Sequence, residues 1–590
     1  MYFAPETGSA AEGEQEGAGE LCRGLAARLN LPAALVAVLW RRGYRDEERI
    51  RAFLHPNLAD LPDPDLLLGM GSAVELLTSA LGSSQPIVIY ADYDADGLTA
   101  GALLYTFLQA QGHRQLHYLL PHRLEDGYGV HARLLAELLR QLPTAARPLL
   151  LTVDCGISDH QAIAAANDLG FTVIVTDHHR PPPQLPPAAA ILNPHQPGCP
   201  FPCKNLAGVG VAFYLLMGLR RQLAREGFWA AGTQPNLKEY LDLVALGTVA
   251  DMVPLRGVNR ILVRAGLEVL QATTRPGLAA LAEIAGIPAG LKGTKGQGRA
   301  LCSEDISFAL APRLNAAGRV AAPETAFRLL ITDDEREAAA LAAELEKLNR
   351  WRRELSENIY LDVRRQAGQA ERQDLNILIY SDPSWHPGVL GIAASRLVRD
   401  FDRPVILLGE EEGIIKGSGR SIEGLDLLAA VGNCEELLLG YGGHAAALGL
   451  SLQKDKLEIF RRQLDRETGQ RLATMPAREA LSIDWSFPEG RIDRYLTSIY
   501  HLLEPFGSGN PEPIFQVRGR LTRPTLAGRN HLRFHWQQPD LCLPGIAFDY
   551  GAIDPELSSR TVELIFTLRR NFYQGQVSWQ LQSKSVSTIT

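Results

Sequence analysis

The chain has 590 residues, too many for one hydrophobic core, and this length predicts three or four domains. Its content of 46% apolar and 21% charged residues is ordinary for a globular protein. The formal net charge of −8 argues against a generally basic nucleic-acid-binding surface. Any nucleic-acid contact is therefore expected in a local groove of Arg and Lys.

Cysteine usage and the N-terminal sequence bear on the cellular compartment. Seven cysteines are few, odd in number and scattered, which favours a reducing cytosol over a disulfide framework. Cys199 and Cys203 have zinc-like spacing without a second pair nearby, and we interpret both as incidental loop thiols. The sequence lacks a basic segment followed by an apolar leader, and no run is long enough to span a bilayer. We expect a soluble cytoplasmic protein with no membrane contact.

The first 81 residues predict no chemistry of their own. Residues 1–20 mix Gly, Ala and Glu without periodicity and are expected to be disordered. Residues 21–81 place apolar side chains at helical spacing, with breaks at prolines, and predict a helical lead-in.

An acidic triplet, Asp92, Asp94 and Asp96, follows the apolar run 86–90 and precedes a small-residue helix over 98–111. Carboxylates at alternate positions repel one another, and a divalent metal is the compensating charge that we expect. The triplet thus occupies a strand-to-helix turn, where parallel strands place ligand sites. A calcium-like acidic loop or a solvated turn is the alternative.

Residues 86 to about 250 alternate between strand-like and helix-like segments, which predicts a doubly wound α/β domain with a parallel sheet, and we place this domain at residues 82–323. The strand 149–153 is followed by Asp154, the strand 171–176 by Asp177, His178 and His179, and an apolar helix over 240–250 by Asp251. Ends of neighbouring parallel strands lie side by side, so Asp94, Asp96, Asp154, His178 and Asp251 are expected to converge on one crevice. Carboxylate and imidazole ligands suit Mn²⁺ or a Mg²⁺/Mn²⁺ pair better than structural zinc.

The same residues resemble the DHH phosphoesterase family. Its pattern is met in Asp94-Ala-Asp96-Gly97, in Asp154-Cys-Gly156, in the triplet 177–179 and in residues 247–251. Within the family, the segments 121–129, 206–213 and 311–319 look like those of the single-strand-specific 5′→3′ exonucleases, and the resemblance extends from about residue 25 to the end. Pyrophosphatase-type members carry a His where this chain has Tyr90, so Asp92 is either a metal ligand or an outer neighbour of the site.

The resemblance implies hydrolysis of single-stranded DNA to 5′-mononucleotides, in repair and recombination, with two ions of Mn²⁺ or Mg²⁺ as cofactors. Asp154 would then bridge the two ions, Asp94 would hold one of them, and Asp96, His178 and Asp251 would hold the other. His179 is assigned, as a hypothesis, to the scissile phosphate or the leaving oxygen.

An exonuclease must also sense an end of its strand. The smaller α/β domain predicted over 367–470 resembles the substrate-binding domain that accompanies DHH domains, and three Gly-rich loops in it carry polar tips. Ordinary tight turns are the alternative for any one such loop. Together with the segment 311–319, these loops supply the candidate phosphate- and nucleic-acid-binding residues, which are Arg123, Arg313, Asn315, Arg319, Ser418, Arg420 and His444.

A long connecting helix is predicted over 324–366, where Gly and Pro are absent from Thr325 onward. Its basic residues Arg350, Arg352 and Arg353 either form a solvated face or touch DNA.

Residues 471–590 predict short strands in which basic and aromatic residues interleave. An OB-like barrel that binds a single strand by stacking and phosphate contacts fits this composition, and an all-β capping domain with aromatic core residues is the alternative. The residues concerned are Arg518, Arg520, Arg529, Arg533, His535, Trp536, Arg569, Arg570, Phe572, Tyr573 and Trp579.

Two other functions share these motifs: a small-substrate DHH enzyme, such as an oligoribonuclease or pyrophosphatase, and a non-catalytic DNA-binding member without metals. The C-terminal region favours a long single strand as substrate over the first, and the retained acids argue against the second. The resemblance also names a single-strand-binding protein and a helicase as candidate partners, and we expect a monomer.

Overall fold

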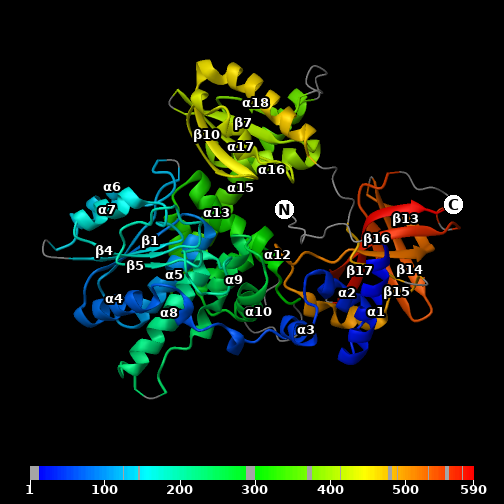
Figure 1. Ribbon diagram of the computed structural model, residues 1–590, viewed down its shortest axis with the longest axis horizontal. Helices are drawn as coiled ribbons and strands as arrows, with labels where there is room; N and C mark the ends of the chain where they lie inside the picture. Colours follow the sequence, from blue (N-terminus) through cyan, green and yellow to red (C-terminus); the bar gives the residue numbers. More distant parts are fainter. Residues whose placement is uncertain are drawn as a thin grey trace.

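The computed structural model describes residues 12–123, 125–143, 147–230, 232–287, 299–367, 375–411, 413–475, 482–487, 490–528, 530–551, 557, 559–573 and 576–589. Three sheets define three bodies: a parallel-sheet domain (residues 70–331), an upper lobe (375–475) and a C-terminal β-domain (482–589) (Figure 1). The expected architecture, a multidomain α/β chain with a doubly wound parallel sheet and a C-terminal β-domain, is confirmed.

The parallel sheet has the strand order β2-β1-β3-β4-β5, so the order reverses between β1 and β3. Side chains of β1 alternate between two apolar cores: Ile87 and Ile89 pack with α4, α5 and α8, and Val88 and Tyr90 with α6 and α7. Helices therefore cover both faces, which explains the continuous apolar runs. The strands are β1 (Ile87–Ala91), β2 (Leu116–Leu119), β3 (Leu149–Val153), β4 (Thr172–Thr176) and β5 (Ala190–Leu192).

Helices of the parallel-sheet domain extend beyond the sheet toward the other two bodies (Figure 1). The elements described between β5 and α15 are all helices, and α9 is buried along nearly its whole length. The helices are α4 (Met70–Ser83), α5 (Ala95–Ala110), α6 (Ala132–Leu139), α7 (His160–Asp168), α8 (Gly208–Arg225), η3 (Leu237–Tyr240), α9 (Leu241–Ala250), α10 (Gly257–Gln271), α11 (Pro276–Ile284), α12 (Ser303–Asp305), the π-helical turn η4 (Ile306–Leu310), α13 (Ala311–Val320) and α14 (Glu324–Ile331).

The helical lead-in packs against the opposite end of the chain. Leu35 and Val38 of α2 share an apolar cluster with Phe515 and Phe566 of the C-terminal β-domain (Figure 1). Helix α1 begins at Glu12, whereas the sequence predicts disorder up to residue 20; residues 1–11 lie outside the described residues. The elements are α1 (Glu12–Leu29), α2 (Ala33–Arg41), α3 (Glu47–Leu54), η1 (Leu58–Asp60) and η2 (Pro64–Leu66).

The predicted connecting helix is divided in two, α14 and α15 (Glu335–Ala367). Asp334 causes the break, because its Oδ1 accepts the backbone N–H groups of Arg336 at 2.7 Å and Glu337 at 2.8 Å and so starts a new helix. The prediction of a single helix is therefore wrong at residues 332–334, and α15 is the long helix that lies in the chain between the parallel-sheet domain and the upper lobe.

The upper lobe is a mixed sheet of order β6-β7-β8-β10-β9, in which only β6 and β7 are parallel. Leu390 and Leu397 of α16 join the core of the parallel-sheet domain, so this helix seats the lobe on α15. Its elements are β6 (Leu378–Ser381), η6 (Pro387–Val389), α16 (Leu390–Phe401), β7 (Val405–Glu411), β8 (Ile414–Arg420), α17 (Leu427–Gly432), η7 (Glu435–Leu437), β9 (Leu438–His444), β10 (Ala447–Gln453), η8 (Lys454–Lys456) and α18 (Leu457–Ala473).

The C-terminal β-domain has the strand order β11-β12-β16-β17-β15-β14-β13. Arg260 of α10 fastens it to the parallel-sheet domain, because its buried guanidinium donates to the carbonyls of Phe53, Leu502, Leu503 and Glu504. Its elements are β11 (Trp485–Ser486), α19 (Arg494–Ile499), η10 (Tyr500–Leu503), β12 (Phe515–Gly519), β13 (Leu521–Ala527), β14 (His531–Gln538), β15 (Leu541–Ala547), β16 (Val562–Tyr573) and β17 (Gln576–Thr588).

Membrane-spanning helices were also sought. Within the described residues, no single helix has the length and apolar content to cross a membrane; two helix pairs meet those criteria only when joined across bends of 117° and 87°.

Candidate metal centre and phosphate site

The sheet positions three acids directly, because Asp92, Asp154 and Asp177 each follow the last residue of β1, β3 or β4. The strand ladder continues through them: the Asp92 N–H donates to the carbonyl of Val153 at 3.2 Å, and the Asp154 N–H to that of Thr176 at 2.9 Å. Asp154 has φ +61°, a left-handed conformation that costs a non-glycine residue energy and is found mostly at functional sites. The acids thus lie at the β1/β3 reversal, where open α/β sheets bind ligands.

Two helix N-termini hold the remaining acids of the triplet. Asp94 caps α5, and its Oδ1 accepts the N–H groups of Asp96 at 2.9 Å and Gly97 at 3.2 Å. Both carboxylate oxygens of Asp96 accept N–H groups at the start of α8, from Gly208 at 2.7 Å and Val209 at 2.8 Å. This placement stabilises the negative charge of Asp96.

Close approach of the helices to these acids requires glycine at two positions. A Cβ at Gly208 would lie 2.7 Å from Oδ1 of Asp154, and a Cβ at Gly247 would lie 2.9 Å from Oδ1 of Asp96. Residues 206–213 and 247–251, noted in the sequence for their pattern, therefore shape the site through their backbones.

His178 lies at the centre of the acids. Its Nε2 is 3.1 Å from Oδ1 of Asp154, 3.6 Å from Oδ2 of Asp251 and 3.9 Å from Oδ2 of Asp96. The structure thus brings together all five residues for which the sequence predicts metal binding, together with Asp92. Their ligand atoms form three overlapping sets, which are Asp92, Asp94 and Asp154; Asp154, His178 and His179; and Asp96, His178 and Asp251.

Four buried atoms of this site form no hydrogen bond with any described residue: Oδ1 of Asp92, Oδ1 of Asp154, Nε2 of His178 and Oδ2 of Asp251. Burial and the neighbouring carboxylates raise the pKa of Asp92 and of Asp154 well above the usual range and that of Asp251 to about 7. Burial lowers the pKa of His178, but Asp251 and Asp96 outweigh it and raise that pKa. Buried, unpaired oxygen and imidazole ligands fit a divalent cation such as Mn²⁺ or Mg²⁺.

His179 is oriented by Asp177. Its Nδ1 is 2.7 Å from Oδ1 of Asp177, 3.3 Å from the hydroxyl of Tyr128 and 3.9 Å from Oδ1 of Asp154. Burial lowers the pKa of His179, but the hydrogen bond to Asp177 outweighs it and raises that pKa to about 9. Asp177 also accepts the backbone N–H groups of Ile157, His178 and His179, so its carboxylate stabilises the loops that follow β3 and β4.

Asp177 and Tyr128 belong to this site although the sequence pattern did not predict them as site residues. The sequence signal that could have identified Asp177 was its position directly after a strand, as the first residue of the segment 177–179. Tyr128 lies in the segment 121–129, which was singled out only for its pattern.

Four arginines gather beside the acids: Arg123 from the loop after β2, Arg319 from α13, Arg352 from α15 and Arg420 from β8. Burial and repulsion by the other three lower the pKa of Arg319 to about 9, while Asp94 partly counteracts this fall. Ser418 supports the cluster, since its Oγ accepts from Nη1 of Arg420 at 3.1 Å. None of the four arginines forms an ion pair with an acid in the part of the chain that the structure describes, so the arginine cluster is suited to an external anion.

Three candidate phosphate residues have other partners or positions. Arg313, expected at the phosphate, instead pairs with Glu346 at 2.7 Å and donates to the carbonyl of Ala309. Asn315 accepts the N–H of Ala95 at 2.8 Å and thereby fixes the acidic loop. His444 is exposed on β9, opposite Ala447, and no contact with the arginine cluster is found for it among the described residues.

The three basic residues Arg350, Arg352 and Arg353 of α15 have different surroundings. Arg350 pairs with Glu346 at 3.0 Å, Arg353 is exposed, and Arg352 turns toward the arginine cluster with its Nε buried and unpaired. A solvated face is thus the better description of Arg350 and Arg353, whereas Arg352 belongs to the cluster.

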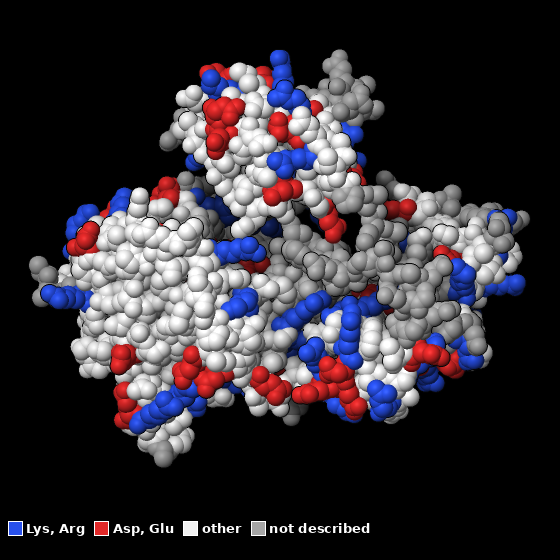
Figure 2. Space-filling model, in the orientation of Figure 1, with Lys and Arg blue, Asp and Glu red and all other residues white. Residues whose placement is uncertain are grey.

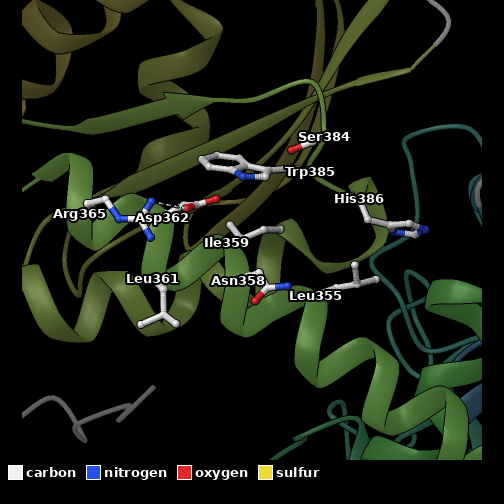
Figure 3. A pocket seen from close by; sticks show the side chains of 9 residues that line it. All are labelled: Leu355, Asn358, Ile359, Leu361, Asp362, Arg365, Ser384, Trp385 and His386. Atoms are coloured by element: carbon white, nitrogen blue, oxygen red, sulfur yellow. Dashed lines mark ion pairs between the residues drawn. The ribbon is translucent and has the colours of Figure 1, made fainter.

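Figure 2 shows a hollow between the upper lobe and the body beneath it, with basic side chains below its margin. A separate cavity of about 370 Å³ is lined by residues of α15 and by Ser384, Trp385 and His386, and is drawn in Figure 3. Asp362 and Arg365, 3.4 Å apart, neutralise each other along one wall, and His386 points away from them. This cavity lacks the unpaired charges of the acid and arginine clusters.

Many basic and aromatic residues of the C-terminal β-domain have structural roles. Trp536 is only 2% exposed and belongs to the core, as the alternative interpretation expected. Arg518 pairs with Glu563, Arg569 with Glu512 and Arg570 with Glu504. Arg520 and Arg533 are exposed; Arg529 and the side chains of Phe572 and Tyr573 lie outside the described residues.

Three family models match the chain: the DHH family N-terminal domain over residues 86–248, the DHHA1 domain over 374–470 and the RecJ OB domain over 483–585. The single-stranded-DNA-specific exonuclease RecJ of Dickeya dadantii is 40% identical over 570 residues, covering 94% of this chain and 95% of that protein. The chain belongs to the RecJ family. RecJ of Escherichia coli is 37% identical, covering 94% of this chain and 96% of that protein.

Solved RecJ structures have the same fold. The crystal structure of Thermus thermophilus RecJ in complex with Mn²⁺ is 32% identical, has a TM-score of 0.79, and covers 97% of this chain and 78% of that one. The Mg²⁺ complex gives 31% identity and a TM-score of 0.73, with coverage of 96% and 76%. Both of these solved relatives are metal complexes, one with Mn²⁺ and one with Mg²⁺. The RecJ OB match also confirms the expected class of the C-terminal domain.

Proposed function

We propose that this RecJ-family exonuclease removes 5′-mononucleotides from the 5′ end of single-stranded DNA with two divalent ions, Mn²⁺ or Mg²⁺. The observation that carries the proposal is the adjacency of two oppositely charged clusters: arginines that form no ion pair with an acid among the described residues, and acids with buried oxygens that accept no hydrogen bond from them. One cluster offers carboxylates to cations, and the other offers guanidinium groups to a phosphate. A small-substrate enzyme would use the acids equally well, but the RecJ OB domain adds a surface for a longer strand.

The proposed metal ligands are Asp92, Asp94, Asp96, Asp154, His178 and Asp251. Asp154 and His178 each occur in two of the three ligand sets, and Asp154 is supported as the bridging ligand because a carboxylate, unlike an imidazole, has two oxygens to share between ions. The buried, unpaired Oδ1 supports Asp92, which the sequence left open. When bound, divalent ions would neutralise phosphate charge and acidify a water molecule as nucleophile.

His179 is proposed as the side chain that meets the scissile phosphate or the leaving oxygen. With a pKa of about 9 it carries a proton at neutral pH. The hydrogen bond from Nδ1 to Asp177 leaves Nε2 to donate to substrate. The Tyr128 hydroxyl, 3.3 Å from Nδ1, helps to fix the ring.

The arginine cluster is proposed to hold the terminal 5′-phosphate. A guanidinium pairs with phosphate through two parallel hydrogen bonds, and four guanidinium groups together suit a dianion. Since Arg319 lies within the electrostatic reach of Asp94, a phosphate held there would present the next phosphodiester to the acids. Polarity and single-nucleotide release would both follow from this arrangement.

The proposed cellular role is DNA repair and recombination, where single-stranded ends are the substrate. The same proposal includes a monomeric state, and a single-strand-binding protein and a helicase as partners of the C-terminal β-domain. This part of the proposal rests on family membership alone.

The proposal is tested with a single strand labelled separately at its 5′ and 3′ ends and incubated with Mn²⁺. The expected result is early release of labelled mononucleotide from the 5′ end, and no comparable attack on a blunt duplex. Persistence of the long strand while two- to five-nucleotide oligomers disappear would replace the proposal with a small-substrate enzyme.

A further inference from the structure

Phe308 is the most exposed large apolar side chain in the described part of the chain, at 78% of its surface. It lies in the middle of the π-helical turn η4, whose end residues Ile306 and Leu310 are buried in the core. The turn is therefore anchored while its phenylalanine is presented to solvent. Burial would have stabilised the fold, so this exposure needs a different explanation.

Contacts on both sides hold η4 in place. Arg313 donates to the carbonyl of Ala309 at 2.7 Å, a carbonyl within the π-helical turn. On the other side, Ser303 donates to the carbonyl of Phe506, and Glu304 pairs with Arg569 at 2.9 Å. Phe308 thus sits where the parallel-sheet domain meets the C-terminal β-domain, on a type of turn that occurs frequently at functional sites.

Helix α13 continues from η4, and the one face of it that is not buried is directed toward the site. Within α13, only Pro312, Asn315 and Arg319 are not buried, and their spacing places them on the same face as Phe308. Asn315 bonds to the acidic loop and Arg319 belongs to the arginine cluster. The face therefore runs along the site, from the arginine cluster at one end to Phe308 at the other.

A second apolar side chain borders the same region. Helix η4 packs against α9, which ends next to Asp251. Met252 follows that acid with φ +62° and is 74% exposed. Phe308 and Met252 thus belong to elements that pack together, and Met252 directly follows an acid of the site. Large, exposed apolar side chains of this kind offer a surface that a nucleobase can cover, because every base has an apolar face.

We propose that Phe308 is a stacking platform for one base of the bound strand, with Met252 beside it, and this rests on the exonuclease function proposed above. Phe308 lies eleven positions before Arg319 in the chain. At the α-helical rise, this spacing corresponds to about 16 Å along the helix axis. Stacked nucleotides advance roughly 3.4 Å each and extended ones more, so the base is roughly the third to fifth from the 5′ end. Phe308 is thus a positioning residue that holds the strand in line with the acids.

This assignment also supplies a source of single-strand selectivity. In a duplex, both faces of each base are covered by neighbouring pairs, so stacking on Phe308 requires a base that has left its stack. The cost of unstacking is smallest for a strand that is already single, which favours such substrates.

The first test compares Phe308→Ala with the unaltered enzyme on a 5′-phosphorylated dinucleotide and on a twelve-nucleotide strand. The value of kcat/KM on the long strand is expected to fall about 5-fold to 100-fold, and that on the dinucleotide to stay unchanged. Phe228→Ala, at a phenylalanine that is 45% exposed beyond α8, is the matched control and should change neither. Equal loss on both substrates, or no loss on the long one, would overturn the assignment.

A second test locates the base. Twelve-nucleotide strands with one abasic site, moved from the second to the eighth position, are expected to give one minimum in kcat/KM near the third to fifth position. Phe308→Ala should abolish that minimum, and Phe308→Trp should keep it. A minimum that persists in Phe308→Ala contradicts the assignment, whereas failure of the unaltered enzyme to release any 5′-mononucleotide would instead contradict the proposed function.

Discussion

The acid cluster and the arginine cluster differ in how the fold assembles them. The acids follow three adjacent strands and one helix of a single domain, so the sheet topology alone brings most of them together. The arginines come from a loop, two helices and a strand of the upper lobe, and meet only when α15 positions that lobe. The acids have buried oxygens without a hydrogen bond and the arginines have no acidic ion-pair partner among the described residues, which suits the binding of metals and of a phosphate proposed above.

Removing the centre of the acid cluster should have the largest effect. Asp154→Ala takes away the carboxylate shared by two ligand sets and is expected to lower the rate of mononucleotide release by a factor on the order of 10³ or more. Bound Mn²⁺ per chain, measured by elemental analysis, should fall in parallel. Full metal content together with normal activity would contradict the central position of Asp154.

Breaking the arginine cluster should change end preference and leave the metals in place. Arg420→Ala is expected to lower kcat/KM on 5′-phosphorylated strands roughly 10-fold to 100-fold, because a charge-assisted hydrogen bond to phosphate is lost. Strands with a 5′-hydroxyl should be affected much less. Arg518→Ala, which removes an arginine paired with Glu563 in the β-domain, is the matched control. An equal loss of kcat/KM on strands with a 5′-phosphate and with a 5′-hydroxyl would show that Arg420 does not act by binding the 5′-phosphate.

A third variant tests the support of His179. Asp177→Asn is expected to lower kcat about 10-fold to 100-fold, since such orienting partners typically contribute that much. The pKa of His179 should fall from about 9 and shift the pH profile of kcat to lower pH. An unchanged pH profile with reduced metal content would instead assign Asp177 to the metals.

The pH dependence of stability gives the smallest expected signal. Asp251 has a pKa of about 7 in the folded chain without metal, above the roughly 3.9 of an unfolded aspartate. The folded state thus binds more protons, and this contribution to stability, present in full below about pH 4, is lost as pH rises through about 7. We expect the melting temperature without metal to fall between about pH 5 and about pH 8, and Mn²⁺ to raise it more at the higher pH. An equal effect of Mn²⁺ at both values would contradict this account.

The acids could be predicted from the sequence because each is local to the end of an apolar segment. Asp154 and His178 required only strand recognition and the rule that parallel strands end together. The arginines required tertiary knowledge. Arg313 and Arg319 lie in one segment, yet α13 turns the first toward Glu346 and the second toward the cluster.

Other features could not be read from the sequence for related reasons. Arg352 joins the cluster through the exact rotation of α15, which begins at the Asp334 cap and not at the predicted start. In the β-domain, alternation along a strand cannot say which side of the barrel is core, so buried Trp536 and exposed Arg533 looked alike. The packing of α2 against the C-terminal strands joins residues too distant in the chain for any local pattern.

The most direct test of the account is the size of the first product released from a 5′-phosphorylated single strand that carries a label on its first base. If the arginine cluster holds the terminal phosphate beside the acids, the first labelled product is a mononucleotide at every time point, and removing the phosphate slows its release. A first product of two or more nucleotides, or release that does not depend on the phosphate, would contradict the proposal that the arginine cluster positions the strand for cleavage at the acid cluster.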